Sequence, residues 1–385
     1  MSFEYNGWER DYLNNQKQYD ELFRNSIMAG EQDVNVNFLE EQVSHIAKRR
    51  YAASVANATD GLQFALEAHG IKAGDEVLVS NFSWISSATP VLAIGAIPVF
   101  CEIDSDTYQI TLDSIKRMST KNTVAIIYPC LFGAIFPEIF NVVEWCKENN
   151  IIFIEDSSQL IGTQLNGVPA GSIGDISVYS FNDNKVIAGI NGGGMVMTNN
   201  KNIRDHVAKL AYHGRGSSWK DRDVKYLGRN SKMYLFNAKV IELRLNKIKE
   251  YQSRRQSIAK IYDEFFANHK QVYVQSFPHN LNHNYHKYVI RFENKKIRDN
   301  VKEKTGANVH YDPAISQNTY FKNKYKTDKT SVSEHCAGTI MSLPIHAWMT
   351  NEEVEEICET IDHSLWESYI YINGCRSSGP LFNLA

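Results

Sequence analysis

The sequence has no surplus of either charge and no long apolar run. Of its 385 residues, 41 are Lys or Arg and 44 are Asp or Glu, so the formal net charge is only −3. Proteins that bind nucleic acid or anionic membranes usually carry a basic excess, which is missing here. No stretch of about 18 apolar residues, the length that spans a bilayer, occurs. We therefore expect no nucleic-acid partner and no membrane partner.

The cysteines are few and far apart. There are six, and no two lie within three residues of each other, which excludes zinc-ribbon and Cys-x-x-Cys spacings. We predict no metal site and expect reduced thiols. The first thirty residues are polar and charged and lack the apolar stretch of a signal peptide. These absences predict a cytoplasmic protein.

What the sequence does contain is the composition of an ordinary globular protein, with 43% hydrophobic and 22% charged residues. Short β-branched runs recur in its first half, and several of them, such as Ile151–Ile154, do not alternate with polar residues. Such runs are typical of strands covered on both faces in a parallel sheet. Helical patterns lie between them, which predicts an α/β fold with a mainly parallel, doubly wound sheet. The seven predicted strands are Tyr51–Ala56, Glu76–Ser80, Ile97–Ile103, Thr123–Tyr128, Ile151–Ile154, Asp175–Phe181 and Gly194–Thr198.

The pattern changes after Thr198. Phe236–Tyr262 reads as one long helix, and after His286 a strand-like piece, Lys287–Phe292, mixes with further helices. We predict a large domain over residues 16–247 and a smaller α+β domain over residues 248–385. Residues 1–15 are expected to pack on the smaller domain.

Two reactive side chains directly follow predicted strands. Asp156 comes after Ile151–Ile154, and Lys185 lies in a glycine-flanked loop after Asp175–Phe181. Ligands of open α/β sheets bind outside the carboxyl ends of the strands. A carboxylate there can hold a protonated ring nitrogen, and a partly desolvated lysine can form a Schiff base. The plainer alternatives are an Asp that caps a helix and a surface Lys.

A phosphate site and an aromatic plate are also possible. Asn57–Leu62 follows a strand and opens a helix, where unpaired amides at Thr59 and Asp60 can bind a phosphate. Trp84 follows the strand Glu76–Ser80 and can stack on a flat ring. The alternatives are a helix capped by Thr59 or Asp60 and a tryptophan buried in the core.

These parts are those needed to hold pyridoxal 5′-phosphate, and their order and spacing resemble the nucleotide-sugar aminotransferases of the DegT–DnrJ type. That family consists of fold-type I pyridoxal phosphate enzymes. The resemblance runs from about Gly30 to about Ile361. It departs from the family at Lys232, where Arg is usual, and at Asp312, which interrupts a His-Tyr-Pro segment. The motifs that carry it are Asn57–Leu62, Glu155–Gln159, Ser180–Lys185, Gly228–Met233 and Ser342–His346.

The resemblance implies a role for each matching residue. Lys185 would form the Schiff base and Asp156 would pair with the pyridinium nitrogen, which makes them the catalytic residues. The other cofactor-binding residues would be Trp84 on the ring, Gln159 near the ring hydroxyl, Thr59, Asp60 and Ser180 on the phosphate, and Asn230 on the phosphate of a neighbouring subunit. The enzyme would then be a homodimer with shared sites. His310 and Tyr311 would lie near the sugar substrate.

The implied activity is transfer of an amino group from an amino acid, with L-glutamate the expected donor, to a keto sugar. A nucleotide-linked keto-deoxysugar aminated at C3 or C4 is the expected acceptor. The alternatives are a smaller phosphorylated or non-sugar ketone, a related sugar dehydratase, and a cofactor-binding protein without catalysis. In the dehydratases His replaces the lysine, so Lys185 favours transamination. The lysine-rich stretch Phe321–Lys329 reads as a solvated loop, or else as a clamp on a diphosphate.

Overall fold

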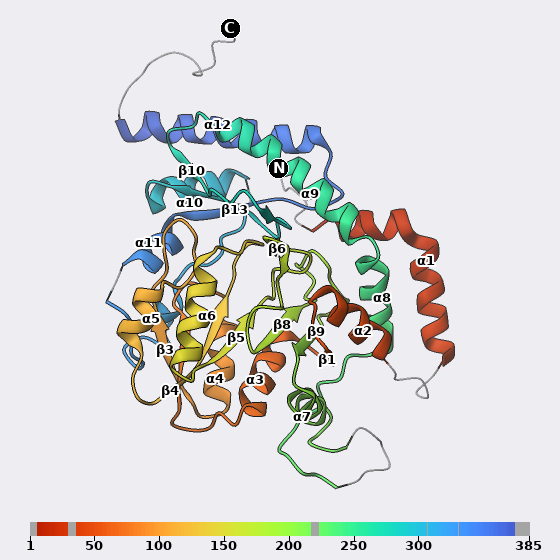
Figure 1. Cartoon of the computed structure of the whole chain (residues 1–385). Coiled ribbons are helices and arrows are strands. Elements are labelled where there is room, and N and C mark those ends of the chain that lie inside the picture. The colour runs from red at the N-terminus through yellow and green to blue at the C-terminus, as the bar shows by residue number, and fades with distance from the viewer. Residues whose placement is uncertain (1–5, 30–35, 217–222, 306, 330, 374–385) are drawn as a thin grey trace.

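A seven-stranded sheet forms the centre of the computed structural model, which describes residues 6–29, 36–216, 223–305, 307–329 and 331–373 (Figure 1). Its order is β1-β9-β8-β5-β4-β2-β3. Strand β9 runs antiparallel to both of its neighbours, β1 and β8, and the other neighbouring pairs are parallel. This confirms the predicted fold class and all seven strands. The strands are β1 (Tyr51–Val55), β2 (Glu76–Ser80), β3 (Ile97–Cys101), β4 (Thr123–Pro129), β5 (Ile152–Asp156), β8 (Ile176–Ser180) and β9 (Gly194–Thr198).

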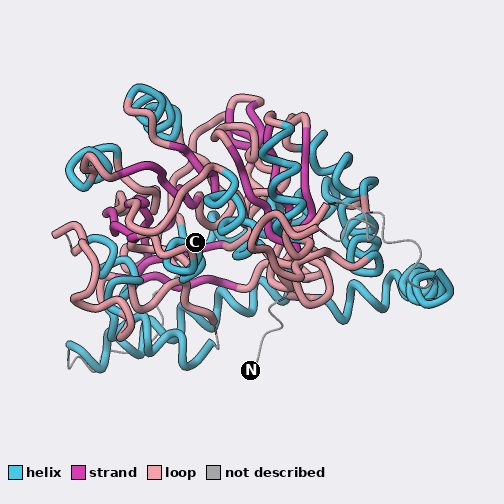
Figure 2. Tube along the Cα trace, turned by 90° about the horizontal axis from the view of Figure 1, so that it is seen from below, coloured by secondary structure: helices cyan, strands magenta, loops and turns pink. Residues whose placement is uncertain are grey.

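Helices cover both faces of this sheet, which explains why its strands are apolar throughout. Along β4, Ala125 and Ile127 face one helical layer, while Ile126 and Tyr128 face the other. Seen from below, the helices surround the strands (Figure 2). The first layer contains α3 (Ala58–Ala68), α4 (Thr89–Ala93) and α7 (Lys201–Ala211). The second contains α2 (Asn37–Ile46), α5 (Leu112–Met118), α6 (Glu138–Glu148) and α8 (Leu235–Leu245).

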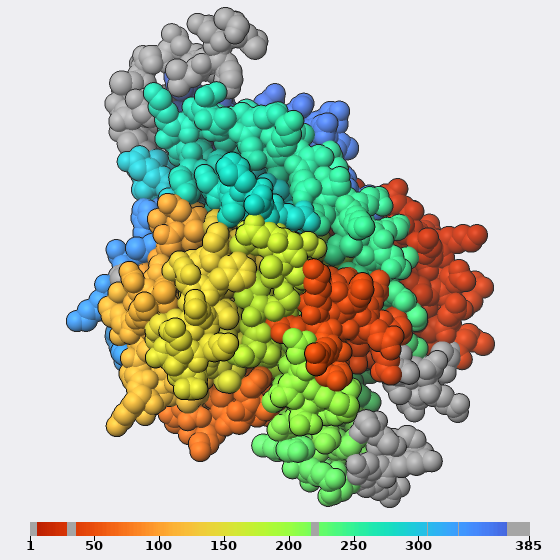
Figure 3. All heavy atoms as spheres, in the orientation of Figure 1, coloured from red at the N-terminus to blue at the C-terminus, as the bar shows by residue number. Residues whose placement is uncertain are grey.

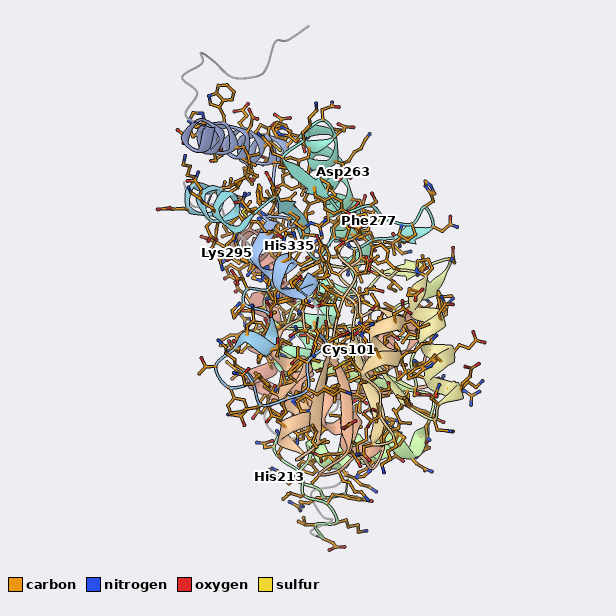
Figure 4. The ribbon with its side chains drawn as sticks, turned by 90° about the vertical axis from the view of Figure 1, so that its left-hand side faces the viewer. Cys101, His213, Asp263, Phe277, Lys295 and His335 are labelled. Carbon is orange, nitrogen blue, oxygen red and sulfur yellow. The ribbon has the colours of Figure 1, made fainter. Side chains whose placement is uncertain are left out.

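The second half of the chain adds two small antiparallel sheets and a separate apolar cluster. β10 (Val272–Val274), β12 (Tyr288–Phe292) and β13 (Ile340–Leu343) form one sheet, and β11 (Leu281–Asn282) joins β6 (Gln164–Leu165) and β7 (Val168–Pro169) in the other. Helices α9 (Ile248–Phe266), α10 (Lys295–Thr305), α11 (Val332–Thr339) and α12 (Asn351–Asn373) accompany the first. Asp263 and Lys295 mark this upper part of the molecule, well above Cys101 in the large sheet (Figure 4).

The single helix predicted over Phe236–Tyr262 is wrong. The structure has two helices, α8 and α9, which are separated at Asn246–Lys247. The physical reason is packing, because α8 lies against the large sheet whereas α9 packs on α12 and β10. One straight helix could not make both sets of contacts, and helical periodicity alone does not show the break.

The N-terminal helix α1 (Trp8–Ala29) lies along α8 on the flank of the molecule (Figures 1 and 3). Its buried Asp11 accepts hydrogen bonds from Arg244 Nε at 2.9 Å and from the Tyr251 hydroxyl at 3.0 Å. Arg10 pairs with Glu353 of α12 at 2.6 Å. The first turn of α1 is therefore fixed to α8, α9 and α12 together.

Five cysteines lie within the described residues and are buried free thiols, while Cys375 lies outside them. Among the described helices, none is long and apolar enough to cross a bilayer.

Candidate active site

A cleft of about 390 Å³ opens at the carboxyl ends of β1, β2, β5 and β8. This is where parallel α/β sheets bind their ligands, and the volume suits a small organic molecule. Three of its lining residues come from the second half of the chain, so the cleft lies where the two halves meet. Its lining includes Asn57, Thr59, Trp84, Asp156, Gln159, Ser180, Asn184, Lys185, His286, His310 and Tyr311.

The start of α3 forms one end of the cleft. Asn57 caps this helix, since its side-chain oxygen accepts a hydrogen bond from the Asp60 amide at 2.8 Å. Thr59 lines the cleft, and its hydroxyl lies 2.8 Å from that of Ser86. The Asp60 carboxylate instead accepts a hydrogen bond from Ser231 at 2.6 Å and is not part of the cleft lining. The cap is therefore neither Thr59 nor Asp60, and of these two only Thr59 is placed to contact a phosphate within this chain.

The glycine run after Lys185 closes the same end. Gly192 and Gly193 line the cleft with φ of 106° and 135°, a region that side chains strongly disfavour. At Gly194 a Cβ would lie only 2.8 Å from the Ala58 nitrogen. The glycines thus bring the backbone close to the start of α3, where a larger residue would crowd this end of the cleft.

Glu155 and Asp156 end β5 and point in opposite directions, as successive strand residues do. Glu155 is fully buried and accepts hydrogen bonds from the amides of Gly171, Ile173 and Gly174, so it secures a turn. Asp156 faces the cleft. Burial raises the pKa of its carboxyl, although hydrogen bonds from Ser158 and the charge of Lys185 oppose the shift. Asp156 is therefore the strand-end carboxylate that a cationic ligand group would stabilise.

Lys185 lines the cleft from the loop after β8. Burial lowers the pKa of its amine from 10.5 to about 8, against the charges of Asp156 and Asp183. The loop is held on both sides of the lysine. Trp8 Nε1 donates to the Asp183 carbonyl, and Arg244 Nη1 donates to the Ala188 carbonyl at 2.8 Å. The structure therefore supplies an amine on an anchored loop, with a larger neutral fraction near neutral pH than an ordinary lysine has.

This lowered pKa predicts how the cofactor-free protein would capture pyridoxal phosphate, the ligand that the sequence resemblance implies. Only the neutral amine attacks an aldehyde, so the capture rate should rise with pH and level off above a midpoint near 8. An ordinary exposed lysine would give a midpoint near 10.4. Stopped-flow absorbance across a pH series measures this midpoint. A capture rate still rising through pH 10 would contradict the burial of Lys185 in the working protein.

Gln159 is held firmly by its neighbours. Its side-chain oxygen accepts a hydrogen bond from the Phe132 amide at 2.6 Å, and its nitrogen donates to the Tyr311 hydroxyl at 2.7 Å. The Tyr311 ring lies 6.3 Å from that of Trp84. Trp84 is 61% exposed, so it is not a core residue and its ring is open to stacking. The two rings form an aromatic wall beside Asp156.

Two predicted substrate residues lie in the cleft, and two other features lie outside it. His310 and Tyr311 both line the cleft, and burial lowers the pKa of His310 to about 3. Asn230 is exposed and is not part of the cleft lining. Its backbone pairs with that of Tyr212. Both residues belong to a projecting segment, here called the arm, at the base of the molecule, where Figure 4 labels His213. No lysine of Phe321–Lys329 lines the cleft, which favours the solvated loop over the clamp.

Sequence reasoning missed Asn184 and His286. Asn184 precedes Lys185 directly, and its side-chain oxygen is buried without a hydrogen-bond partner among the described residues. Its place beside the lysine was the available signal. His286 reaches the cleft from the segment before β12, and no local pattern distinguishes it.

The residues present fit pyridoxal phosphate. Thr59, Ser180, Gly192 and Gly193 line the cleft with hydroxyl and backbone groups that suit a phosphate, and Trp84 offers a face for the ring. Asp156 and Lys185 line the same cleft and supply a carboxylate for a protonated ring nitrogen and an amine for an aldehyde. The unpartnered Asn184 oxygen adds an acceptor for a polar ligand group.

Comparisons with known proteins identify the family that this chain matches. The DegT/DnrJ/EryC1/StrS aminotransferase family model matches residues 14–362. A UDP-N-acetyl-3-dehydro-α-D-glucosamine 3-aminotransferase of Acidithiobacillus ferrooxidans is 30% identical over 332 residues, which cover 85% of this chain and 88% of the relative.

Two solved structures share the fold. A DegT/DnrJ/EryC1/StrS aminotransferase from Brucella abortus has a TM-score of 0.86 at 23% identity, covering 93% of this chain and 98% of its own. A putative sugar aminotransferase, Spr1654 from Streptococcus pneumoniae in its PLP form, has a TM-score of 0.82 at 23% identity, covering 90% and 96%.

Proposed function

Because this chain belongs to the DegT/DnrJ/EryC1/StrS aminotransferase family, we propose that it transfers an amino group from L-glutamate to a nucleotide-linked keto-deoxysugar. Family membership makes it a pyridoxal phosphate-dependent sugar aminotransferase. The donor, the nucleotide and the keto position are the proposal. The observation that carries it is the buried amine of Lys185 facing the same cleft as Asp156.

Pyridoxal phosphate, when bound, supplies a ring that takes up the electrons of the bond broken at the donor α-carbon. The chain's own residues do the rest. Asp156 keeps a proton on the ring nitrogen, because its buried carboxylate gains a partner there. Lys185 Nζ takes the proton from the donor α-carbon as a general base and later returns a proton as a general acid. Thr59 and Ser180 hold the phosphate, and Trp84 lies against the ring.

The acceptor side of the cleft supports a sugar. Polar groups of Asn184, His310 and Tyr311 line the same cleft as the apolar face of Trp84, and sugars combine hydroxyl groups with apolar ring faces. The Acidithiobacillus relative is named for a UDP-linked 3-keto sugar, which makes 3-keto sugars the first acceptors to test.

The experiment tests both halves of the reaction separately. L-glutamate alone should bleach the visible absorption of the holoenzyme and release 2-oxoglutarate. UDP-, GDP- and dTDP-linked 3-keto and 4-keto sugars, with the matching free sugars and phosphorylated ketones, would then be offered to the bleached enzyme. Mass spectrometry should find the amino sugar only with a nucleotide-linked acceptor, and kinetics should be ping-pong. Amination of a small phosphorylated ketone alone, or elimination without amination, would reject the proposal.

We also propose that two copies of this chain share their active sites. Asn230 does not line its own cleft, and its arm carries the exposed side chains of Val224 and Leu227. Helix α1 also carries the exposed apolar side chains of Leu13, Phe23, Ile27 and Met28. Exposed apolar groups of this extent are typical of a surface that another protein covers.

A complementation experiment tests the shared site. Lys185→Ala and Asn230→Ala should each be impaired when pure. Mixed dimers would contain one site with both changes and one site with neither, so mixing should restore up to about a quarter of wild-type activity in a random mixture, since half of the dimers are mixed. Mixed samples that stay as inactive as the pure variants would place Asn230 in its own subunit's function. Sedimentation velocity measures the oligomeric state.

A further inference from the structure

His286 joins two parts of the active site that are far apart in the sequence. Its side chain is 3% exposed and lines the cleft. Its Nδ1 atom lies 3.0 Å from the side-chain oxygen of Gln159, and its Nε2 atom lies 3.1 Å from the backbone carbonyl of Asn184. One contact therefore holds Gln159, for which the resemblance implies a place near the ring hydroxyl, and the other holds the peptide just before Lys185.

Both of these contacts present an acceptor to the imidazole ring. The Gln159 oxygen also accepts from the Phe132 amide at 2.6 Å, and the Gln159 nitrogen donates to Tyr311, so the amide orientation is fixed. The Asn184 group is a carbonyl and can only accept. A neutral imidazole has one N–H, so it can satisfy one of the two at a time.

The charges around His286 favour the neutral ring. Burial is the first cause that holds the pKa of His286 well below its usual range. Lys185, Lys287 just before β12 and Arg255 on α9 add positive charge near the ring, and His310 also faces it. The neutral ring then donates either to Gln159 or to the Asn184 carbonyl. The carboxylates near Lys185 are Asp156 on β5 and Asp183 on the same loop.

A neighbouring histidine shows that this arrangement is not a general feature of the segment. His283 is also buried, but its Nδ1 accepts a hydrogen bond from the Tyr285 amide two residues away, at 2.7 Å. It is not part of the cleft lining. His283 stabilises its own turn, whereas His286 contacts residues 127 and 102 positions away.

We propose that His286 is a positioning residue that fixes Lys185 against the cofactor by donating its N–H to the Asn184 carbonyl, with Gln159 as the alternative partner. This inference rests on the proposed function only in that Lys185 is the reacting amine. A lysine whose loop shifts by about 1 Å would lose on the order of 100-fold in rate, because proton transfer requires close alignment.

Three substitutions separate the two contacts. In His286→Gln the amide reaches the place of Nε2 and can keep the contact with Asn184. In His286→Asn the shorter amide occupies the place of Nδ1 and can keep only the contact with Gln159. His286→Phe removes both contacts. His283→Asn is the matched control, because the new oxygen can still accept from the Tyr285 amide.

The readouts are turnover with glutamate, cofactor affinity, borohydride trapping on Lys185, and the pH midpoint of the bound cofactor's visible absorption. We expect turnover to fall about 100-fold in His286→Asn and His286→Phe and less than about tenfold in His286→Gln. Cofactor affinity should change less than about threefold, because the phosphate contacts remain. In His286→Phe the midpoint should move to lower pH, since an apolar ring disfavours the protonated lysine nitrogen. The control should keep the wild-type turnover and midpoint.

Several results would overturn the proposal. One is an equal loss of turnover in His286→Asn and His286→Gln. Another is a lower melting temperature of the His286 variants with turnover and the pH midpoint of the bound cofactor unchanged. If His286→Phe does not fold, the comparison of Asn with Gln still decides. Failure of the proposed function would look different. The wild-type protein would then aminate no nucleotide sugar, while borohydride trapping on Lys185 and the pH midpoint of the bound cofactor would still differ between the His286 variants.

Discussion

Replacing Lys185 by alanine should lower amino transfer by at least about 10⁴-fold, the largest effect expected of any single change in this protein. The reason is that one amine serves both as the attachment point of the cofactor and as the carrier of the proton. Among the described residues that line the cleft, no other has an amine. Turnover with L-glutamate and a keto-sugar acceptor, measured against wild type, gives the size of the loss.

Lys185→Ala should lose turnover but not the ability to bind pyridoxal phosphate. Thr59, Ser180 and Asp156 are unchanged in Lys185→Ala, so the variant should still bind pyridoxal phosphate. Borohydride should not trap the cofactor on this variant, and denaturation should release it. Lys201→Ala is a matched control, because Lys201 is an exposed lysine that pairs with Asp205 on α7. It should keep full activity. A Lys185→Ala enzyme with turnover within tenfold of wild type would show that another group moves the proton.

The positions of Asp156, Lys185 and Trp84 could be expected from the sequence because each follows a strand. A buried apolar run predicts a strand in a parallel sheet, and the carboxyl ends of parallel strands share one edge. Three residues spread over about a hundred positions were therefore expected at one site before any contact was known. The same reasoning predicted the seven strands.

Other features depend on contacts that no local pattern records. Thr59 and Asp60 are adjacent at a helix start, yet Thr59 lines the cleft and the Asp60 carboxylate turns to Ser231. Successive helical residues point about 100° apart, and the position of Ser231 decides which of them faces away. The place of His286 in the cleft could not be predicted, because it depends on a contact with Gln159, which is 127 positions away in the sequence.

Replacing Asp156 by asparagine should give the second largest effect, a loss of about 10²–10³-fold in turnover. An amide carries no charge, so it cannot keep a proton on the ring nitrogen, and the bond at the donor α-carbon then breaks more slowly. The change also removes a charge that raises the pKa of Lys185. The pH midpoint for cofactor capture should therefore fall below 8, which the same stopped-flow series measures.

Stability should move differently from activity in this variant. Burial raises the pKa of the Asp156 carboxyl, so ionisation at neutral pH costs the cofactor-free protein free energy. Asp156→Asn removes that cost, and its melting temperature without cofactor should equal or exceed that of wild type.

Glu155 supplies the contrast from the same strand. It accepts three backbone hydrogen bonds away from the cleft, so Glu155→Gln should lower the melting temperature while the capture midpoint stays near 8. If Asp156→Asn instead lost stability and kept its turnover, Asp156 would be a structural residue like Glu155. Two neighbouring carboxyl groups on opposite faces of β5 thus separate the chemistry of the site from the stability of the fold.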